Sequence, residues 1–118
     1  MEFQVKYYKD ISGRKPVEEF LLGLGKKNLK LQAKAFEGIA KLRNKEYHTE
    51  PLSKHLESGL WELRIKSGRD ILRIFYTFMK GRIIILLHGF IKKQQKTLSN
   101  ELQMARKRLK QIKAEEAN

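Results

Sequence analysis

The chain has 118 residues, of which 41% are hydrophobic, and this is enough apolar material for one domain, residues 1–118, with a single core. There is no cysteine, which excludes a disulfide framework and a thiolate metal site. The formal net charge is +13, so the sequence predicts a polyanionic partner, either a nucleic acid or an acidic protein.

The first residues alternate apolar and polar side chains, whereas a secretion signal needs a basic segment followed by an apolar block. The longest apolar run, 83–87, is far shorter than the roughly 18 residues that a membrane span requires. We therefore expect a cytoplasmic protein that makes no membrane contact. Because the sequence has no Gly-rich phosphate loop and no His/Asp cluster at useful spacing, we expect neither a cofactor nor a metal ion.

The N-terminal half shows one strand signal and two helix signals. Period-two alternation over 3–8 predicts a strand, and Pro16 followed by apolar residues at helical spacing predicts a short helix that Gly23 and Gly25 end. A second helix is expected from 26 to about 43, packed with the first as a hairpin. Its apolar side chains form two adjacent rows, expected to be mostly buried: Leu29, Ala33, Phe36 and Ala40 in one, and Leu31, Ala35, Ile39 and Leu42 in the other.

The C-terminal half is expected to supply most of the sheet. Residues 44–58 are polar and predict a connecting loop that is a possible wall of a site. A last amphipathic helix with a basic outer face is expected after Thr97 or Ser99 as its cap. Between the loop and this helix lie three strand-like runs, joined by turns so short that the pairing must be antiparallel: 60–66, 71–78 and 82–90.

The resulting order β-α-α-β-β-β-α predicts an α+β fold, in which an antiparallel sheet packs one face on the helical hairpin and leaves the other face free for function. In the run 60–66, alternation assigns Trp61, Leu63 and Ile65 to the core face. The same alternation assigns three charged residues to the free face: Glu62, Arg64 and Lys66.

Arg73 stands out because it is a permanent cation within the apolar run 71–78. Without a functional role, it would be expected to form an ion pair with Asp70 or Glu62. Tyr76, which alternates with the core residues of the same run, is expected to be a packing residue. Trp61 is expected in the core rather than stacked on a nucleobase.

Three segments together resemble a known family: 60–65 (Leu-Trp-Glu-Leu-Arg-Ile), 70–76 (Asp-Ile-Leu-Arg-Ile-Phe-Tyr) and 87–97 (Leu-His-Gly-Phe-Ile-Lys-Lys-Gln-Gln-Lys-Thr). The chain resembles the phage-derived, HigB-like branch of the RelE/ParE toxin superfamily in these motifs, in length and in element order. The resemblance implies a RelE-like fold. It also implies a toxin that cuts messenger RNA, usually on the ribosome, until an antitoxin binds it.

The resemblance also implies roles for individual residues. Arg73 falls where the cleaving members keep an arginine that contacts the scissile phosphate, and Arg64 falls on a basic position of the preceding strand. Either Lys92 or Lys93 falls near the basic position after the last strand that supports the transition state. Two positions depart from the family pattern: Glu62 stands where some members have a second lysine, and Leu98 where this branch commonly has proline.

RNA cleavage requires deprotonation of a 2′-hydroxyl, stabilisation of the charged phosphorane and protonation of the leaving 5′-oxygen. Fixed cations such as Arg64, Arg73 and Lys93 supply the second requirement without a metal ion. His88 is a candidate proton carrier; in the alternative interpretation it is a core histidine that shares a face with Ile84 and Leu86. Further basic residues are candidates for RNA binding: Lys66, Arg69, Lys96, Arg106, Lys107 and Lys110.

Two other functions fit the same sequence features. The first is a ParE-like toxin that poisons DNA gyrase, and the second is a non-catalytic nucleic-acid-binding protein. Under the favoured interpretation the partners are messenger RNA on the ribosome and a HigA-like helix-turn-helix antitoxin, with operator DNA bound only through the toxin–antitoxin complex. His48 and His55 are expected to be plain surface residues of the loop.

Overall fold

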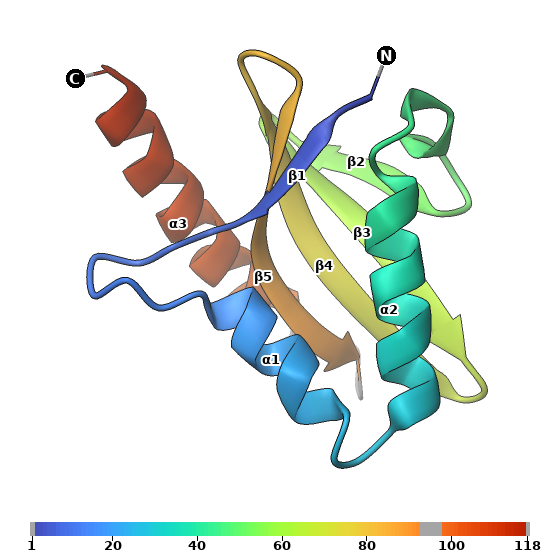
Figure 1. Ribbon diagram of the computed structural model, residues 1–118. Helices are drawn as coiled ribbons and strands as arrows, with labels where there is room; N and C mark the ends of the chain where they lie inside the picture. The colour runs from blue at the N-terminus through green and yellow to red at the C-terminus, as the bar shows by residue number, and fades with distance from the viewer. Residues whose placement is uncertain (1, 93–97, 118) are drawn as a thin grey trace.

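The computed structural model describes residues 2–92 and 98–117. Its elements follow the predicted order, with one additional strand and one 3-10 turn (Figure 1). The elements are β1 (Gln4–Tyr7), α1 (Pro16–Leu24), α2 (Leu29–Lys41), η1 (Lys45–Tyr47), β2 (Ser53–Glu57), β3 (Leu60–Ser67), β4 (Asp70–Met79), β5 (Ile83–Lys92) and α3 (Leu98–Ala117). None of the helices in this described part of the chain combines the length and apolar character of a membrane-spanning segment.

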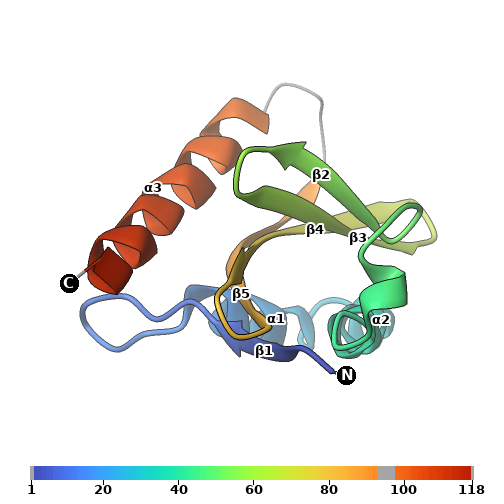
Figure 2. The same ribbon diagram turned by 90° about the horizontal axis from the view of Figure 1, so that it is seen from above.

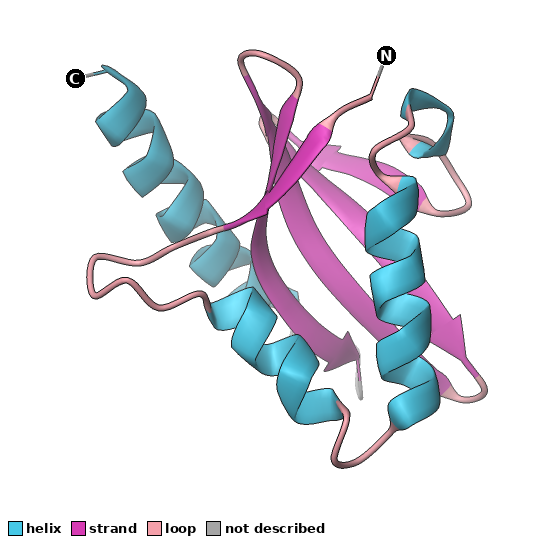
Figure 3. Ribbon diagram, in the orientation of Figure 1, coloured by secondary structure: helices cyan, strands magenta, loops and turns pink. Residues whose placement is uncertain are grey.

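The five strands form one mixed sheet in the order β1-β5-β4-β3-β2 (Figure 3). The strands from β2 to β5 pair antiparallel, as the short turns require, but β1 runs parallel to β5. The expectation of an all-antiparallel sheet is therefore wrong for β1. Turn length fixes the direction of neighbouring strands only, and β1 is separated from β5 by most of the chain.

The segment 44–58 is not simply a loop, because it contains η1 and the edge strand β2. The strand was not predicted because its side chains are mostly polar, and Lys54 and His55 are exposed. Ser53, by contrast, is fully buried and accepts a hydrogen bond of 2.9 Å from the Tyr76 hydroxyl. Burial raises the pKa of that hydroxyl. Tyr76 is thus a core residue as predicted, and Trp61 packs against the same core.

Both faces of the sheet are covered by helices, α1 and α2 on one side and α3 on the other (Figure 2). The larger core lies under α1 and α2 and contains Leu21, Leu31 and Ile74. The smaller core lies under α3 and contains Phe75, Leu87, Phe90, Ala105 and Leu109. The expectation that one face is free is therefore wrong for the part that α3 covers, because the apolar stripe of α3 needs a surface to pack on.

α2 contacts the sheet through only one of its two apolar rows. Leu31, Ala35 and Leu42 are fully buried, and Gly38 lies so close to β3 that an added Cβ atom would stand 2.2 Å from Cδ1 of Ile65. The other row, expected to be mostly buried, is exposed: Leu29, Ala33, Phe36 and Ala40. The two rows are not adjacent: at 100° per residue their centres lie about 135° apart around the helix, so a single sheet cannot cover both.

The start of α3 excludes one of the two predicted caps. The helix begins at Leu98, so Ser99 lies inside its first turn rather than at the cap. The other predicted cap, Thr97, lies outside the described residues. The helix then packs Ala105 and Leu109 on the sheet.

Candidate functional site

Three strands bring the predicted site residues together on the face that α3 only partly covers. Direct cross-strand partners of antiparallel strands point to the same face. On this face three rows cross β3, β4 and β5, and the middle row holds two arginines. The rows are Glu62–Phe75–His88, Arg64–Arg73–Phe90 and Lys66–Ile71–Lys92. α3 packs over the row that contains Phe75, so the rows of Arg64 and Lys66 lie toward the open end.

Glu62 holds both arginines of the middle row. Its Oε1 accepts a hydrogen bond of 2.9 Å from Nε of Arg64, and its Oε2 accepts one of 3.0 Å from Nη1 of Arg73. Only 1% of the Glu62 side chain is exposed. Two like charges directly across a strand pair repel each other, and a shared carboxylate offsets this repulsion. Of the two ion pairs that the sequence offered for Arg73, with Asp70 or with Glu62, the structure contains the one with Glu62.

The Arg73 guanidinium is not fully satisfied by Glu62. Only 8% of its side chain is exposed, and its Nε has no hydrogen-bond partner among the described residues. An unpaired buried donor costs about 1–3 kcal/mol, and such groups are expected where a ligand supplies the missing acceptor. Arg73 still lines a pocket with a volume of about 610 Å³, so its cationic group borders a space that can hold a ligand.

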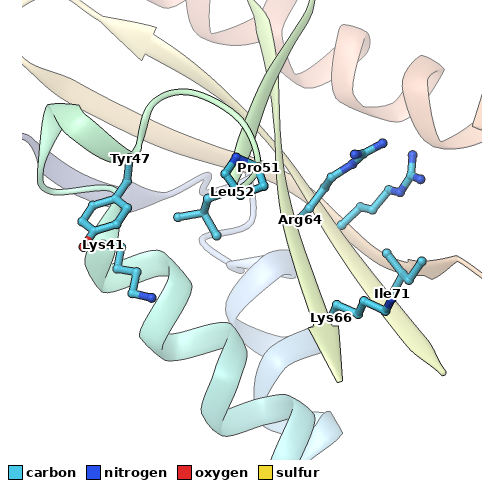
Figure 4. A pocket seen from close by; sticks show the side chains of 8 residues that line it. Lys41, Tyr47, Pro51, Leu52, Arg64, Lys66 and Ile71 are labelled. Atoms are coloured by element: carbon cyan, nitrogen blue, oxygen red, sulfur yellow. The ribbon is translucent and has the colours of Figure 1, made fainter. Parts of the chain in front are cut away.

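That pocket runs around the open part of β3, beyond the end of β2 (Figure 4). Figure 4 shows Lys41 and Tyr47 on one side, Arg64 on the other, and Pro51 and Leu52 between them. The lining thus combines cations with an aromatic ring and apolar side chains. The complete lining is Lys41, Tyr47, Pro51, Leu52, Arg64, Lys66, Ile71 and Arg73.

The segment 44–58 therefore does supply a wall of the site, as the sequence indicated, although Tyr47 itself was not singled out. Lys41, the last residue of α2, lies 5.6 Å from the centroid of the Tyr47 ring. An aromatic residue in a segment already suspected as a wall was the available signal. His48 is not a plain surface residue: its ring contacts Phe3 and Phe78, and its Nε2 lies 2.6 Å from the Leu42 carbonyl oxygen.

A β-bulge moves His88 to the site face. The pairing of β4 with β5 shifts between Phe75 and Tyr76, whose partners are His88 and Leu86, so Leu87 is the extra residue. An extra residue reverses the alternation beyond it. Strict alternation predicted that His88 shares a face with Leu86, and this prediction is wrong. His88 instead stacks on Phe90, with ring centroids 5.8 Å apart.

Both ring nitrogens of His88 contact α3. Nε2 lies 3.2 Å from Oε1 of Glu101, and Nη1 of Arg108 lies 3.3 Å from Nδ1. A guanidinium can only donate, so Nδ1 accepts and Nε2 carries the proton directed at Glu101. Arg108 also donates a hydrogen bond of 2.8 Å to the carbonyl oxygen of the bulged Leu87, and burial lowers its pKa.

Glu101 and Arg108 were missed in the sequence, although helical spacing was a usable signal. Both lie within one helical face with Ala105, at intervals of four and three residues, and Ala105 belongs to the apolar stripe of the helix. The charged residues of that face could have been expected to meet the sheet.

The other predicted site residues are divided among three places. Lys66 and the exposed Arg69 lie at the open end, and Lys92 shares a row with Lys66, whereas Lys93 and Lys96 lie outside the described residues. Arg106 binds Glu57 through two hydrogen bonds of 2.7 and 2.9 Å, and Glu57 pairs with Leu60 at the opposite end of β3. Lys107 and Lys110 are exposed on α3.

The site offers cations rather than metal ligands. In residues 2–92 and 98–117 no three His, Asp or Glu side chains are grouped so that they could hold a metal ion. What the arrangement provides is a buried arginine with an unpaired donor, a second arginine fixed by the same carboxylate and a neighbouring lysine. Such an arrangement binds an anion with several oxygen atoms, such as a phosphate group.

Fold and site together define a small α+β domain with a RelE-like arrangement and a basic, partly aromatic pocket. Residues 20–110 match the family model described as phage-derived protein Gp49-like (DUF891). The chain therefore belongs to the Gp49-like family, which is associated with RelE-like toxins. This membership is compatible with the toxin of a toxin–antitoxin system. No curated protein matches the sequence.

Proposed function

We propose that the chain is the toxin of a type II toxin–antitoxin system and cuts messenger RNA, with the ribosome holding the substrate and a HigA-like antitoxin neutralising it. The observation that carries this proposal is Arg73, a nearly buried arginine that borders the pocket and whose Nε has no hydrogen-bond partner in the described part of the chain. A guanidinium fixed in this way is suited to a phosphate whose charge grows during the reaction.

In the proposed reaction the 2′-oxygen of one ribose attacks the adjacent phosphorus, and the bond to the 5′-oxygen of the next nucleotide breaks. Arg64 and Arg73 stabilise the additional negative charge on the phosphorane, and Glu62 keeps both guanidiniums in place before substrate arrives. Lys66 and Lys92, from the neighbouring row, bind the flanking phosphates.

The walls of the pocket suit the rest of a nucleotide. Tyr47 presents an aromatic ring, and Pro51 and Leu52 present apolar surface within reach of the same cavity. Bases of single-stranded RNA stack on such side chains. His88 lies one row beyond Arg73 and is the proposed proton carrier, which takes the proton of the 2′-hydroxyl and gives it to the departing 5′-oxygen. Because both of its ring nitrogens contact α3, His88 must exchange its contact with Arg108 or Glu101 for the substrate.

The test is primer extension on messenger RNA after a pulse of expression. Arg73→Lys is the informative variant, because a lysine still offers a positive charge to Glu62 but lacks the planar fork of donors. We expect about a 100-fold loss of cleavage, the size seen when one transition-state donor is removed. Lys54→Ala, an exposed lysine outside the pocket, is the matched control and should cleave like the parent.

Two results would refute the proposal. One is a folded Arg73→Lys protein that cuts messenger RNA as fast as the parent. The other is growth arrest by the parent with intact messenger RNA, which would favour the gyrase-directed or purely binding alternative. Because Arg73→Ala would leave the buried Glu62 with one partner fewer, circular dichroism must accompany every variant at this position.

A further inference from the structure

α2 is apolar on two opposite sides, and only one side is covered. A surface helix normally places polar side chains opposite its buried face. Here the outward side carries a row with 70% of Leu29 and 38% of Phe36 exposed, and the two alanines between and after them are exposed as well. Figures 1 and 2 show α2 at the outside of the molecule, with the sheet on its inner side only. We call Leu29, Ala33, Phe36 and Ala40 the outer stripe.

The spacing of the outer stripe is that of a helix–helix seam. Its members follow one another at intervals of four, three and four residues, the pattern of the a and d positions in a coiled coil. At 1.5 Å per residue the stripe is about 16 Å long, which is three turns of a partner helix. Small residues alternate with large ones, so a partner can place its own large side chains over Ala33 and Ala40.

The charge beside the outer stripe indicates what kind of helix fits. At 100° per residue, Lys30, Lys34 and Lys41 lie along one edge of it, with Glu37 among them. Glu37 is 3.6 Å from the Nζ atom of Lys41, so the edge is basic overall. Acidic residues at the flanking positions of a partner helix would complement this edge.

A second copy of the chain is a poor match for the same surface. Its own α2 would bring the same lysines rather than an acidic edge, and each copy carries a net charge of +13. Like charge of this size opposes association. The complementary occupant is therefore a different protein of acidic character.

We infer that the outer stripe of α2 is a docking surface for an acidic amphipathic helix of a partner protein. Apolar side chains of that helix cover Leu29 and Phe36, and acidic side chains along its edge meet Lys30 and Lys34. Lys34 exchanges its hydrogen bond of 3.5 Å to the Lys66 carbonyl oxygen for this contact. The inference goes beyond RNA cleavage, because the outer stripe faces away from the sheet, whereas Arg64 and Arg73 lie on the other face of the sheet. Lys41, at the end of α2, borders both the edge of the stripe and the pocket. If the chain is a toxin, the neutralising protein is the partner that would supply such a helix.

The test uses a fluorescent peptide of three heptads, with leucine at a and d and glutamate at the flanking positions. Its control is a peptide of the same composition with the leucines redistributed. Anisotropy titrations at about 0.15 M salt keep simple charge attraction low. We expect saturable binding of the amphipathic peptide, with the control peptide weaker by about tenfold or more.

Matched variants locate the binding. Leu29→Ser with Phe36→Ser should weaken binding about tenfold or more, whereas Ile11→Ser with Met104→Ser, exposed apolar residues elsewhere, should stay within about twofold. Lys30→Glu with Lys34→Glu should weaken it more than Lys54→Glu with Lys80→Glu, which changes the net charge equally. All eight positions are exposed, so the fold is expected to survive.

Three results would overturn the inference. The first is equal binding of the two peptides, and the second is unchanged binding to the stripe variant. The third is a dimer of the parent, seen by sedimentation, that Phe36→Ser dissociates, since a second copy would then occupy the stripe. Because none of these measurements involves RNA, their failure is distinguishable from failure of the proposed cleavage activity.

Discussion

Glu62 is the residue on which the site depends most. In the sequence it was a departure from the family pattern, a carboxylate where some members have lysine. In the structure it is almost fully buried and fixes Arg64 and Arg73 at the same time. A second lysine there would place a third cation beside the row of the two arginines, whereas glutamate reduces the local charge and fixes the geometry.

We predict that Glu62→Gln destabilises the fold strongly. It removes the charge that two cross-strand arginines share, and breaking a buried pair in this way costs about 3–5 kcal/mol. Urea denaturation monitored by circular dichroism measures the change. Glu37→Gln is the control, because the exposed pair of Glu37 with Lys41 is worth only about 0.3–0.5 kcal/mol. Equal losses in the two variants would contradict the importance of Glu62.

At the scale of elements, periodicity predicted the helices and four of the strands, and it failed where local spacing carries no information. β2 was missed because an edge strand can be mostly polar. The face of His88 was wrong because the bulge at Leu87 reverses the alternation. Gly89, two residues farther along β5, was the available signal, since a glycine inside a strand often marks a bulge. The two rows of α2 were both apolar, so the sequence could not indicate which row would meet the sheet.

The contact of α2 with β3 makes a second prediction. Gly38→Ala would place a methyl group in the space of the Ile65 side chain, and overpacking of this kind costs about 1–3 kcal/mol. Gly23→Ala, inside α1 with open space around the added Cβ, should instead stabilise by about 0.5–1 kcal/mol. Thermal unfolding of the two variants checks the opposite signs. A stabilising Gly38→Ala would mean that α2 lies farther from the sheet.

The docking of α3 depends on pH through Glu57. The hydrogen bonds from Arg106 hold the pKa of this carboxyl below its ordinary value of 4.5. The pKa of Glu57 is lower in the folded state than in the unfolded state. The pair with Arg106 therefore stabilises the docked helix at pH values above 4.5, and this contribution is lost as the pH falls through the folded-state pKa.

We therefore predict that Arg106→Gln returns the pKa of Glu57 toward 4.5, which an NMR titration of the carboxyl carbon measures. In the parent, the protection factors of the α3 amides should fall as the carboxyl becomes protonated, and the variant should show the lower protection already at neutral pH. Lys110→Gln, also on α3 and exposed, should leave the titration unchanged. An unaltered Glu57 titration in Arg106→Gln would contradict the pairing.

At the scale of the whole molecule, the α+β class and the basic character could be predicted, but the distribution of charge over the surface could not. The sequence predicted that the bases of the last helix form its outer face. The structure divides those bases, since Arg106 neutralises Glu57 and Arg108 is partly buried against Tyr8. Which bases remain available depends on partners that lie far away in the chain, and one sequence does not show them.

The remaining cations of the open end lead to a prediction about salt. For single-stranded RNA, each phosphate contact contributes about −0.7 to the slope of log affinity against log salt concentration. Lys66→Ala and Lys92→Ala should each reduce this slope by about 0.7, whereas Lys80→Ala, in the turn at the other end of β4, should not change it. Filter binding of a short RNA over a salt series provides the slopes. Identical slopes in all variants would remove the open end from the RNA interface.

The parallel pairing of β1 with β5 also has a consequence for how the protein is made. β1 precedes the other described strands in the chain but pairs with β5, the last of them. Gln4 therefore cannot pair until Ile83 has been synthesised. Pairings between such distant residues slow folding, because the intervening chain must first be brought together. The nascent chain thus holds β1 without its neighbour until β5 has left the ribosomal exit tunnel. Only after that moment do Lys92 and Phe90 join the rows of Lys66 and Arg73, so a chain that lacks β5 carries an incomplete site.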